Sequence, residues 1–302
     1  RDLGADDYFY PSDLGDEQSA TRPYVFSRPW GVPVRYHDAV AFMEAFKPDM
    51  IEFHLSYKDM ERDPGDYLQG PYDIGFAVHA PELFEGSRLM DLATPDNELR
   101  EYSVRETQRV IDITRALKKF FPSTERPCIV ANVGGISMDA PLSAEEKALR
   151  YKIFFESLER LDMAGVELTP QTMAPFPWHF GGQRHQNIFI FPDECAEVCA
   201  RHGLRMTLDV SHTLLAANQF GFDFIKGVEA LAPYVAHLHL GDSRGLDGEG
   251  LQIGEGEIDF AALGALLART APDATFIPEI WQGHKNTGEG FRVALERLEP
   301  FL

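Results

Sequence analysis

The 302-residue sequence is poor in basic residues: 28 Lys and Arg stand against 48 Asp and Glu, and the net charge is −20. Proteins that bind a nucleic-acid backbone depend on Lys and Arg to neutralise phosphates, and no basic stripe interrupts the acidic background here. We therefore expect no nucleic-acid partner. An acidic, solvated surface explains the charge.

Cysteine is also scarce. Cys128, Cys195 and Cys199 are an odd number and lack the spacing of a metal site. Cys195 and Cys199 lie four residues apart on one face of a predicted helix, which is typical of small buried hydrophobic residues. Unpaired thiols favour a reducing cytoplasm.

Long hydrophobic runs are missing. No run approaches the roughly eighteen apolar residues of a membrane span, so we expect no membrane partner. The first ten residues lack both the basic and the apolar region of a signal peptide, and the sequence does not begin with Met. Residues 1–22 are polar and aperiodic, and we expect an arm or the remnant of a preceding domain there, followed by one domain over residues 23–302.

What the sequence does contain is a regular alternation of strand-like and helix-like segments. Strands are predicted at residues 24–27, 50–55, 74–79, 127–133, 166–168, 204–209, 234–240 and 274–279, and residues 29–33 are predicted to be a rigid loop. Helices are predicted at residues 37–46, 96–120, 143–163, 192–202, 222–232, 259–270 and 288–298, with another from about residue 213. Only residues 58–71 offer no proper helix.

This pattern predicts an α/β fold, a single (β/α)8 TIM barrel. An open doubly wound sheet is the alternative. The Gly-x-Gly-x-x-Gly fingerprint of dinucleotide-binding sheets is absent after the first strand, which argues against it.

Ionisable side chains gather where the predicted strands end, and in such barrels the active site lies at the C-terminal ends of the strands. They are His54, His79, Glu167, Asp209, His212, His239 and Glu279. A single acid at a strand end is often the N-cap of the next helix. Several carboxylates at one end of a barrel need a cation to offset their repulsion and desolvation. We therefore predict one bound divalent metal ion.

Glu167, Asp209, His239 and Glu279 are the predicted ligands. Three carboxylates and one imidazole suit Mn²⁺, Mg²⁺ or Co²⁺, and Zn²⁺ remains open. His212 follows Asp209 at i+3 and can face the same cavity. His237 shares a strand face with His239 but lies deeper, and we interpret it as a core histidine.

The glycine-rich segment after the strand at 234–240 carries several acids and is predicted to hold a cation or polar ligand. Arg244 in this segment suits a carboxylate or phosphate group of an anionic sugar. Trp178 and Trp281 lie in strand-end loops, where a flat ring can cover a sugar's C–H face. The predicted substrate-binding residues are His54, His79, Trp178, His212, Arg244 and Trp281.

Several short motifs resemble those of the xylose isomerase-like TIM barrels. They are H-A-P at 79–81, the lone Glu167, D-x-x-H at 209–212, H-L-G-D at 239–242, G-E-G-E-I-D at 254–259 and P-E at 278–279. That superfamily contains sugar isomerases and epimerases, inosose dehydratases and apurinic-site endonucleases, and the resemblance covers nearly the whole chain from residue 24. It implies that the four predicted ligands form a single-metal quartet and that Glu167 and Glu279 are the acid/base pair.

Two departures argue against the trinuclear zinc nucleases of that superfamily. Residues 132–135 read Asn-Val-Gly-Gly where the nucleases carry a histidine, and residues 247–249 read Asp-Gly-Glu where they carry Asp-x-His. A weaker second metal site formed by His212, Asp247 and Glu249 stays open.

A narrower similarity concerns residues 28–38, 175–183 and 278–286. They resemble barrels that are attached to, or encoded beside, N-acetylneuraminate synthase-type enzymes of surface-sugar biosynthesis. This resemblance implies a fused or neighbouring sialic-acid-synthase-like domain.

The predicted function is a metal-dependent sugar isomerase or epimerase. The cation lowers the cost of an enediolate, while one carboxylate removes the proton next to the carbonyl and another returns it. The expected substrate is a small carbohydrate, and homo-oligomer formation is left open. The alternatives are a metal-dependent hydrolase or lyase of the same superfamily, or a sugar-binding module of a larger enzyme.

Overall fold

The structure, a computed structural model, describes residues 23–179 and 182–302. In this part of the chain eight parallel strands form a barrel in the order β1-β2-β3-β6-β8-β12-β13-β16. Their bounds are β1 (Gly31–Val34), β2 (Met50–His54), β3 (Gly75–His79), β6 (Cys128–Ala131), β8 (Glu167–Pro170), β12 (Met206–Asp209), β13 (Val235–Leu240) and β16 (Thr275–Pro278). Single bridges from Gln171 to Thr207 and from Trp30 to Phe276 close the barrel. The predicted barrel is confirmed, and the expected arm at 1–22 lies outside the described residues.

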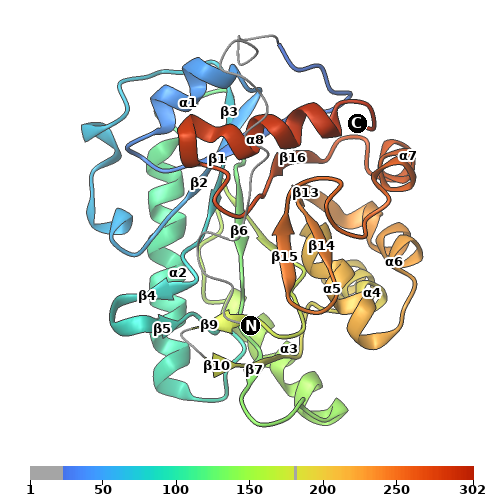
Figure 1. Cartoon of the computed structure of the whole chain (residues 1–302). Helices are drawn as coiled ribbons and strands as arrows, with labels where there is room; N and C mark the ends of the chain where they lie inside the picture. The colour runs from blue at the N-terminus through green and yellow to red at the C-terminus, as the bar shows by residue number, and fades with distance from the viewer. Residues whose placement is uncertain (1–22, 180–181) are drawn as a thin grey trace.

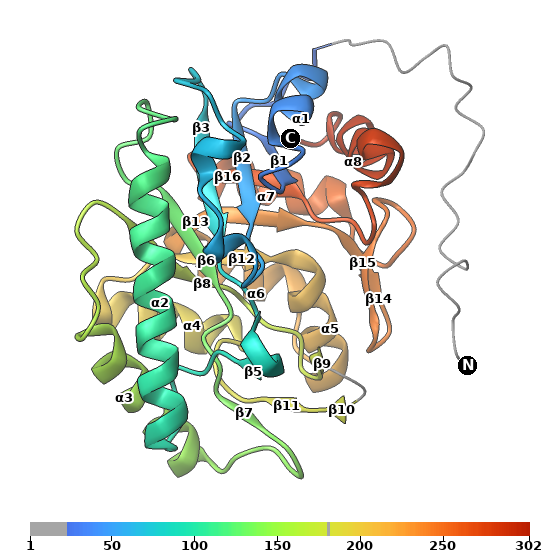
Figure 2. The same ribbon diagram turned by 90° about the vertical axis from the view of Figure 1, so that its left-hand side faces the viewer.

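Helices cover the outside of the barrel (Figures 1 and 2). They are α1 (Ala39–Phe46), α2 (Asn97–Leu117), α3 (Ala144–Leu158), α4 (Pro192–His202), α5 (Val210–Phe220), α6 (Phe224–Leu231), α7 (Phe260–Thr270) and α8 (Lys285–Leu298). A capping box starts α3, because Ser143 and Glu146 satisfy each other's backbone N–H groups. Gly203, directly after the predicted helix at 192–202, ends α4 in the left-handed conformation. No described helix is long and apolar enough to cross a membrane.

Residues 58–71 contain the short 3-10 turns η1 (Asp59–Glu61) and η2 (Pro64–Asp66) in place of a helix, as the sequence indicated. Two further 3-10 turns are η3 (Glu85–Ser87) and η4 (Ala232–Tyr234). Four short antiparallel strand pairs lie in the loops outside the barrel strands. They are β4 (Leu83–Phe84) with β5 (Arg88–Leu89), β7 (Ile136–Ser137) with β11 (His185–Gln186), β9 (Trp178–His179) with β10 (Gly182–Gln183), and β14 (Asp242–Arg244) with β15 (Gly248–Leu251).

The first strand is not where the sequence placed it. Residues 24–27 are irregular, and β1 lies in the segment predicted to be a loop. Pro29, Gly31 and Pro33 made that segment read as a loop, since these residues are depleted in strands. Gly31 is needed there because a Cβ would lie 2.5 Å from the Met50 carbonyl oxygen across the β1–β2 pair.

The strand that carries Glu167 extends further than predicted. The predicted strand ended at Leu168, whereas β8 begins at Glu167 and continues to Pro170. Every residue of β8 is buried, and Pro170 still pairs with Ala131 of β6. The C-terminal end of this strand, where barrel chemistry is found, is therefore at Gln171.

Candidate functional site

Polar side chains fill the interior of the barrel in two layers. Successive side chains of a strand alternate between the outside and the inside, so residues two apart stack along the barrel axis. The deeper layer contains Glu52, Thr169, Thr207, His237 and Thr275. The layer at the strand ends contains His54, His79, Gln171, Asp209, His239 and Glu279.

Asp209, His239 and Glu279 come together at the ends of β12, β13 and β16. His239 Nδ1 lies 2.7 Å from Glu279 Oε2 and 4.0 Å from Asp209 Oδ2. Asp209 and His239 are buried, whereas about a third of the Glu279 side chain (34%) is exposed. Glu279 is therefore the carboxylate of this cluster that a bound molecule can reach. Three of the four predicted metal ligands meet here.

Electrostatics couple these three groups. Burial raises the pKa of Asp209 to about 7, and the nearby Glu279 carboxylate adds to the effect. Burial also disfavours a charged Glu279, but His239 outweighs it and holds the pKa of Glu279 well below its usual value. Burial lowers the pKa of His239, yet Glu279 and Glu52 outweigh it and raise that pKa well above the usual value. The cluster thus attracts positive charge between its carboxylates.

Glu167 does not join the cluster. It is the first residue of β8, four residues before Gln171, which places it about 13 Å further down the strand. Its carboxylate forms a two-pronged ion pair with Arg205, with Nε–Oε1 at 2.9 Å and Nη2–Oε2 at 2.5 Å. This geometry separates Glu167 from the other three predicted ligands and gives its carboxylate a partner in Arg205, so it lends no support to Glu167 as a metal ligand and one of the acid/base pair.

Gln171 takes the fourth position, and sequence reasoning missed it. Its amide Nε2 lies 3.0 Å from Asp209 Oδ2 and 3.2 Å from His239 Nδ1, and its Oε1 lies 3.2 Å from His79 Nε2. The residue is 2% exposed. A search for ionisable residues passes over a glutamine. Gln171 can be found from the sequence if the strand is extended to Pro170, because every second residue from Glu167 to Gln171 then faces the same side.

Glu52, the second missed residue, lies beneath His239. Its carboxylate is fully buried and approaches Nε2 of His54 (2.8 Å), His237 (2.8 Å) and His239 (3.1 Å). Burial opposes its charge, but the adjacent His239 and the three imidazole contacts hold its pKa well below the usual value. Because Glu52 accepts at Nε2, Nδ1 of His239 faces Asp209 and Glu279. Metal-bound histidines are oriented in the same way by a carboxylate on their second ring nitrogen.

The other histidines surround this centre. The His79 ring lies 5.0 Å from that of His54 and 5.7 Å from that of His239, and burial lowers the pKa of His79. His212 lies beside the cluster, with Nδ1 bonded to the Thr172 carbonyl and 3.4 Å from Asp209 Oδ2. His237 is a buried core histidine that contacts Thr275 Oγ1, as interpreted from the sequence.

The remaining predicted residues lie at the rim. Arg244 is exposed on β14, and Trp281, 57% exposed, donates its backbone N–H to Gly250 beside β15. The backbone of Trp178 lies in β9, and its side chain is outside the described part of the structure. Of the suggested second metal site, His212 Nε2 lies 3.6 Å from Glu249 Oε1, and Asp247 is exposed in the turn between β14 and β15. In the described ranges, two groups have ligand atoms close enough to hold a cation, Glu52 with His237 and His239, and His79 with His239 and Glu279. Neither includes this trio, and Asp209 belongs to neither.

The glycine-rich segment is folded around its own acid. Asp242 is fully buried, and its carboxylate accepts the backbone N–H groups of Ser243, Gly254, Gly256 and Ile258. These bonds hold the β14–β15 hairpin, which follows directly from β13 (Figure 2). Asp242 therefore shapes the rim of the site, and its carboxylate is occupied by backbone donors.

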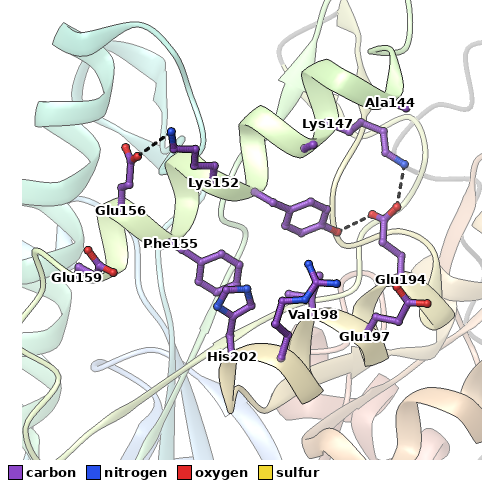
Figure 3. A pocket seen from close by; sticks show the side chains of 13 residues that line it. Ala144, Lys147, Lys152, Phe155, Glu156, Glu159, Glu194, Glu197, Val198 and His202 are labelled. Carbon is purple, nitrogen blue, oxygen red and sulfur yellow. Dashed lines mark hydrogen bonds and ion pairs between the residues drawn. The ribbon is translucent and has the colours of Figure 1, made fainter.

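A separate groove of about 630 Å³ lies on the outer surface between α3 and α4 (Figure 3). Lys147 and Tyr151 both contact the Glu194 carboxylate, at 2.9 and 2.6 Å. Phe155 stacks on His202 with ring centroids 3.5 Å apart. The groove runs along the outer helices rather than at the strand ends, so we assign the candidate site to the barrel interior.

The interior cluster suits a divalent cation. Two carboxylates and an imidazole nitrogen supply oxygen and nitrogen ligands of the kind that Mn²⁺, Mg²⁺, Co²⁺ and Zn²⁺ accept, and the Gln171 amide lies beside them. His79, His239 and Glu279 offer ligand atoms within 4.8 Å of one another. A cation would also offset the burial, and the repulsion from Glu279, that raise the pKa of Asp209.

Comparisons with known proteins agree with this architecture. A D-tagatose 3-epimerase-like protein shares 20% identity, with 90% of this chain and 98% of that chain covered and a TM-score of 0.59. The 3-keto-D-glucoside 4-epimerase of E. coli shares 13%, with 90% and 99% covered and a TM-score of 0.60. The D-psicose 3-epimerase of Clostridium cellulolyticum H10 shares 13%, with 90% and 96% covered and a TM-score of 0.56. At these identities the likeness establishes the fold.

No curated protein matches the sequence. The family model described as xylose isomerase-like TIM barrel matches residues 38–300, which span every barrel strand except β1. With the closed barrel and the polar cluster at its strand ends, this match establishes that the chain belongs to the xylose isomerase-like TIM barrel family.

Proposed function

We propose that this chain is a divalent-metal-dependent isomerase or epimerase of a small sugar or sugar derivative. The observation that carries the proposal is the convergence of Asp209, His239 and Glu279 at the ends of three adjacent barrel strands. Sugar epimerases among the structurally similar proteins support the same class of reaction. The metal is Mn²⁺, Mg²⁺, Co²⁺ or Zn²⁺, held by these three side chains with the amide of Gln171 beside them.

The chain's own groups have distinct parts in this proposal. Bound there, a divalent cation supplies polarisation of the substrate carbonyl, which acidifies the neighbouring C–H bond. Glu279 is the general base, because it is ionised and its side chain is 34% exposed. Asp209 is fixed by the backbone N–H of His212, which donates to Oδ1 at 2.8 Å. Glu52 orients His239 from below.

Contacts with the sugar come from the rim and from the histidines of the upper layer. We assign hydroxyl binding to His54, His79 and His212, which surround the cluster. Arg244 on the hairpin suits an anionic group on the sugar, and Trp281 presents an exposed ring that can cover a C–H face. Trp178 keeps its proposed role as a second aromatic wall.

Two proposals concern the setting of the enzyme. The three cysteines are unpaired, and we propose a reducing, cytoplasmic location on that basis. The similarity of residues 28–38, 175–183 and 278–286 to barrels associated with N-acetylneuraminate synthase supports a role beside or within such an enzyme. Both are tested by locating the full-length protein and its neighbours in the cell.

Metal content of the purified protein tests the proposed function directly. We expect about one equivalent of metal after reconstitution with Mn²⁺, and a loss of affinity of about 100-fold or more in Glu279→Ala, because removing a charged ligand removes a direct metal bond. Glu197→Ala on the outer helix α4 is the matched control and retains the metal. Retention in Glu279→Ala would refute the site, and two or three equivalents of zinc would favour the hydrolase alternative.

A further inference from the structure

Gln171 makes the cluster asymmetric. In the barrel order, β8 and β16 flank the β12–β13 pair, so Gln171 and Glu279 stand on either side of Asp209 and His239. Both reach the same atom, His239 Nδ1, Glu279 at 2.7 Å and Gln171 at 3.2 Å. One flank thus carries a carboxylate that takes up and releases protons, and the other carries an amide that does neither at neutral pH.

We propose that Glu279 is the one carboxylate of the cluster that exchanges protons with the substrate, and that the chain therefore catalyses aldose–ketose isomerisation on one face of the substrate rather than epimerisation. This inference rests on the proposed function and selects between its two reactions. Inversion at a carbon requires a proton to leave one face and return to the other, which needs an acid/base group on each side. Isomerisation needs one group, which carries the proton from one carbon to its neighbour on the same face.

The proton and electron movements balance with Glu279 alone. Glu279 takes the proton from C2 of the aldose, and the C–H electron pair forms the C1–C2 double bond of an enediolate whose negative charge lies on O1. The O2 hydroxyl proton passes to O1. The carbonyl then forms at C2, and Glu279 returns its proton to C1. No oxidant, reductant or further reactant is required.

The surroundings of Gln171 support a positioning role. Its amide bonds Asp209 through Nε2 and His79 through Oε1, at 3.0 and 3.2 Å, and the side chain is 2% exposed. Glu167, the carboxylate nearest in sequence on this strand, is held at the opposite end by Arg205 and cannot replace it. Gln171 thus completes the cluster as a neutral group that fixes its neighbours.

Mn²⁺ binding measured by calorimetry tests the position of Gln171. Gln171→Glu adds a third carboxylate to the cluster, so we expect its Mn²⁺ affinity to be about tenfold or more tighter than that of the wild type. Glu167→Gln, the matched change at the other end of β8, leaves the affinity within about twofold. An unchanged or weaker affinity in Gln171→Glu, or a loss in Glu167→Gln, overturns the inference. Absence of Mn²⁺ binding in wild type and Gln171→Glu alike refutes the proposed function as well.

Deuterium labelling tests the reaction without any variant. The wild type with Mn²⁺ is incubated in D₂O with D-fructose, D-psicose, D-tagatose and D-sorbose, and proton NMR follows C1 and C3. We expect deuterium at one C1 position together with an aldose product, and no inversion at C3. Inversion at C3 overturns the inference while leaving a sugar epimerase in place, and His79 is then the second acid/base group to test. A lack of exchange at both carbons in all four ketoses also counts against it.

Discussion

The orientation of His239 depends on a residue that has no contact with the open part of the site. Glu52 comes from β2, on the far side of the barrel from β13, and its carboxylate lies within 3.1 Å of His239 Nε2. It also binds His237 and His54, so one buried charge holds three imidazoles. Breaking such a buried pair by removing one charge is costly, because the other partners stay buried.

We therefore predict that Glu52→Gln lowers the free energy of unfolding by about 3 kcal/mol and weakens Mn²⁺ binding by about 10- to 100-fold. Chemical denaturation and calorimetry measure the two effects. Glu106→Gln is the control, because Glu106 is a buried carboxylate of the outer helix α2 that pairs with Arg109 at 2.7 Å. A variant that is destabilised but binds Mn²⁺ as tightly as the wild type would show that Glu52 acts on the fold alone.

Among the elements, the turn after β6 depends on a buried acid from the segment before α2. Asp91 Oδ1 accepts the backbone N–H groups of Ala93 and Gly135, at 2.9 and 3.0 Å. Gly134 must be glycine there, because its φ is +90° and a Cβ would lie 2.1 Å from Asp91 Oδ1. Burial raises the pKa of Asp91 from 3.8 to about 6.

This shift predicts a pH dependence of stability with a definite sign. Between about pH 4 and 6 the folded protein keeps the Asp91 proton that the unfolded chain releases, so its contribution to stability falls as pH rises through this window. Asp91→Asn retains the acceptor oxygen and removes the titration. We expect the variant to gain stability relative to the wild type from pH 4 to pH 6.5, by on the order of 3 kcal/mol, in urea unfolding followed at several pH values. A difference that does not vary with pH would contradict the prediction.

The two misplaced strands show which elements a sequence specifies by itself. Most strands and helices were predictable because their apolar periodicity, the Ser143–Glu146 capping box and Gly203 act locally. β1 and the end of β8 contain prolines, and there burial in the closed barrel overrides a local preference for loops.

The site residues also divide into those that local sequence signals predict and those that depend on the assembled barrel. Asp209, His239 and Glu279 each close an apolar run, so their convergence follows once the barrel is assumed. Gln171 was hidden by the misplaced strand end and by its lack of charge. Glu52 shows the period of two with His54, but its partner His237 is 185 residues away and is found only across the assembled barrel.

At the scale of the whole molecule, the barrel consists of a five-stranded and a three-stranded part, and one of the two places where they meet lies between β8 and β12. A single backbone bridge, from Gln171 to Thr207, joins them there. Side chains complete this seam: Thr169 contacts Thr207 in the interior at 2.9 Å, and the Glu167–Arg205 pair ties the opposite end of the strands. The ion pair with Arg205 therefore gives the Glu167 carboxylate a structural role, whereas the sequence suggested that it binds a metal.

We predict that Glu167→Gln and Arg205→Gln each lower the free energy of unfolding by about 1 kcal/mol, or roughly 2 °C in Tm, and that the double variant loses no more than either alone. The effect is modest because about half of the Arg205 side chain (52%) is exposed and solvent screens the pair. Thermal unfolding of the wild type, the two single variants and the double variant measures the coupling between Glu167 and Arg205. Mn²⁺ calorimetry on the same samples shows whether either residue also affects metal binding. If the stability losses of the two single variants add up in the double variant, the ion pair does not help to close the barrel. If Glu167→Gln loses Mn²⁺ affinity and Arg205→Gln does not, Glu167 is a metal ligand after all.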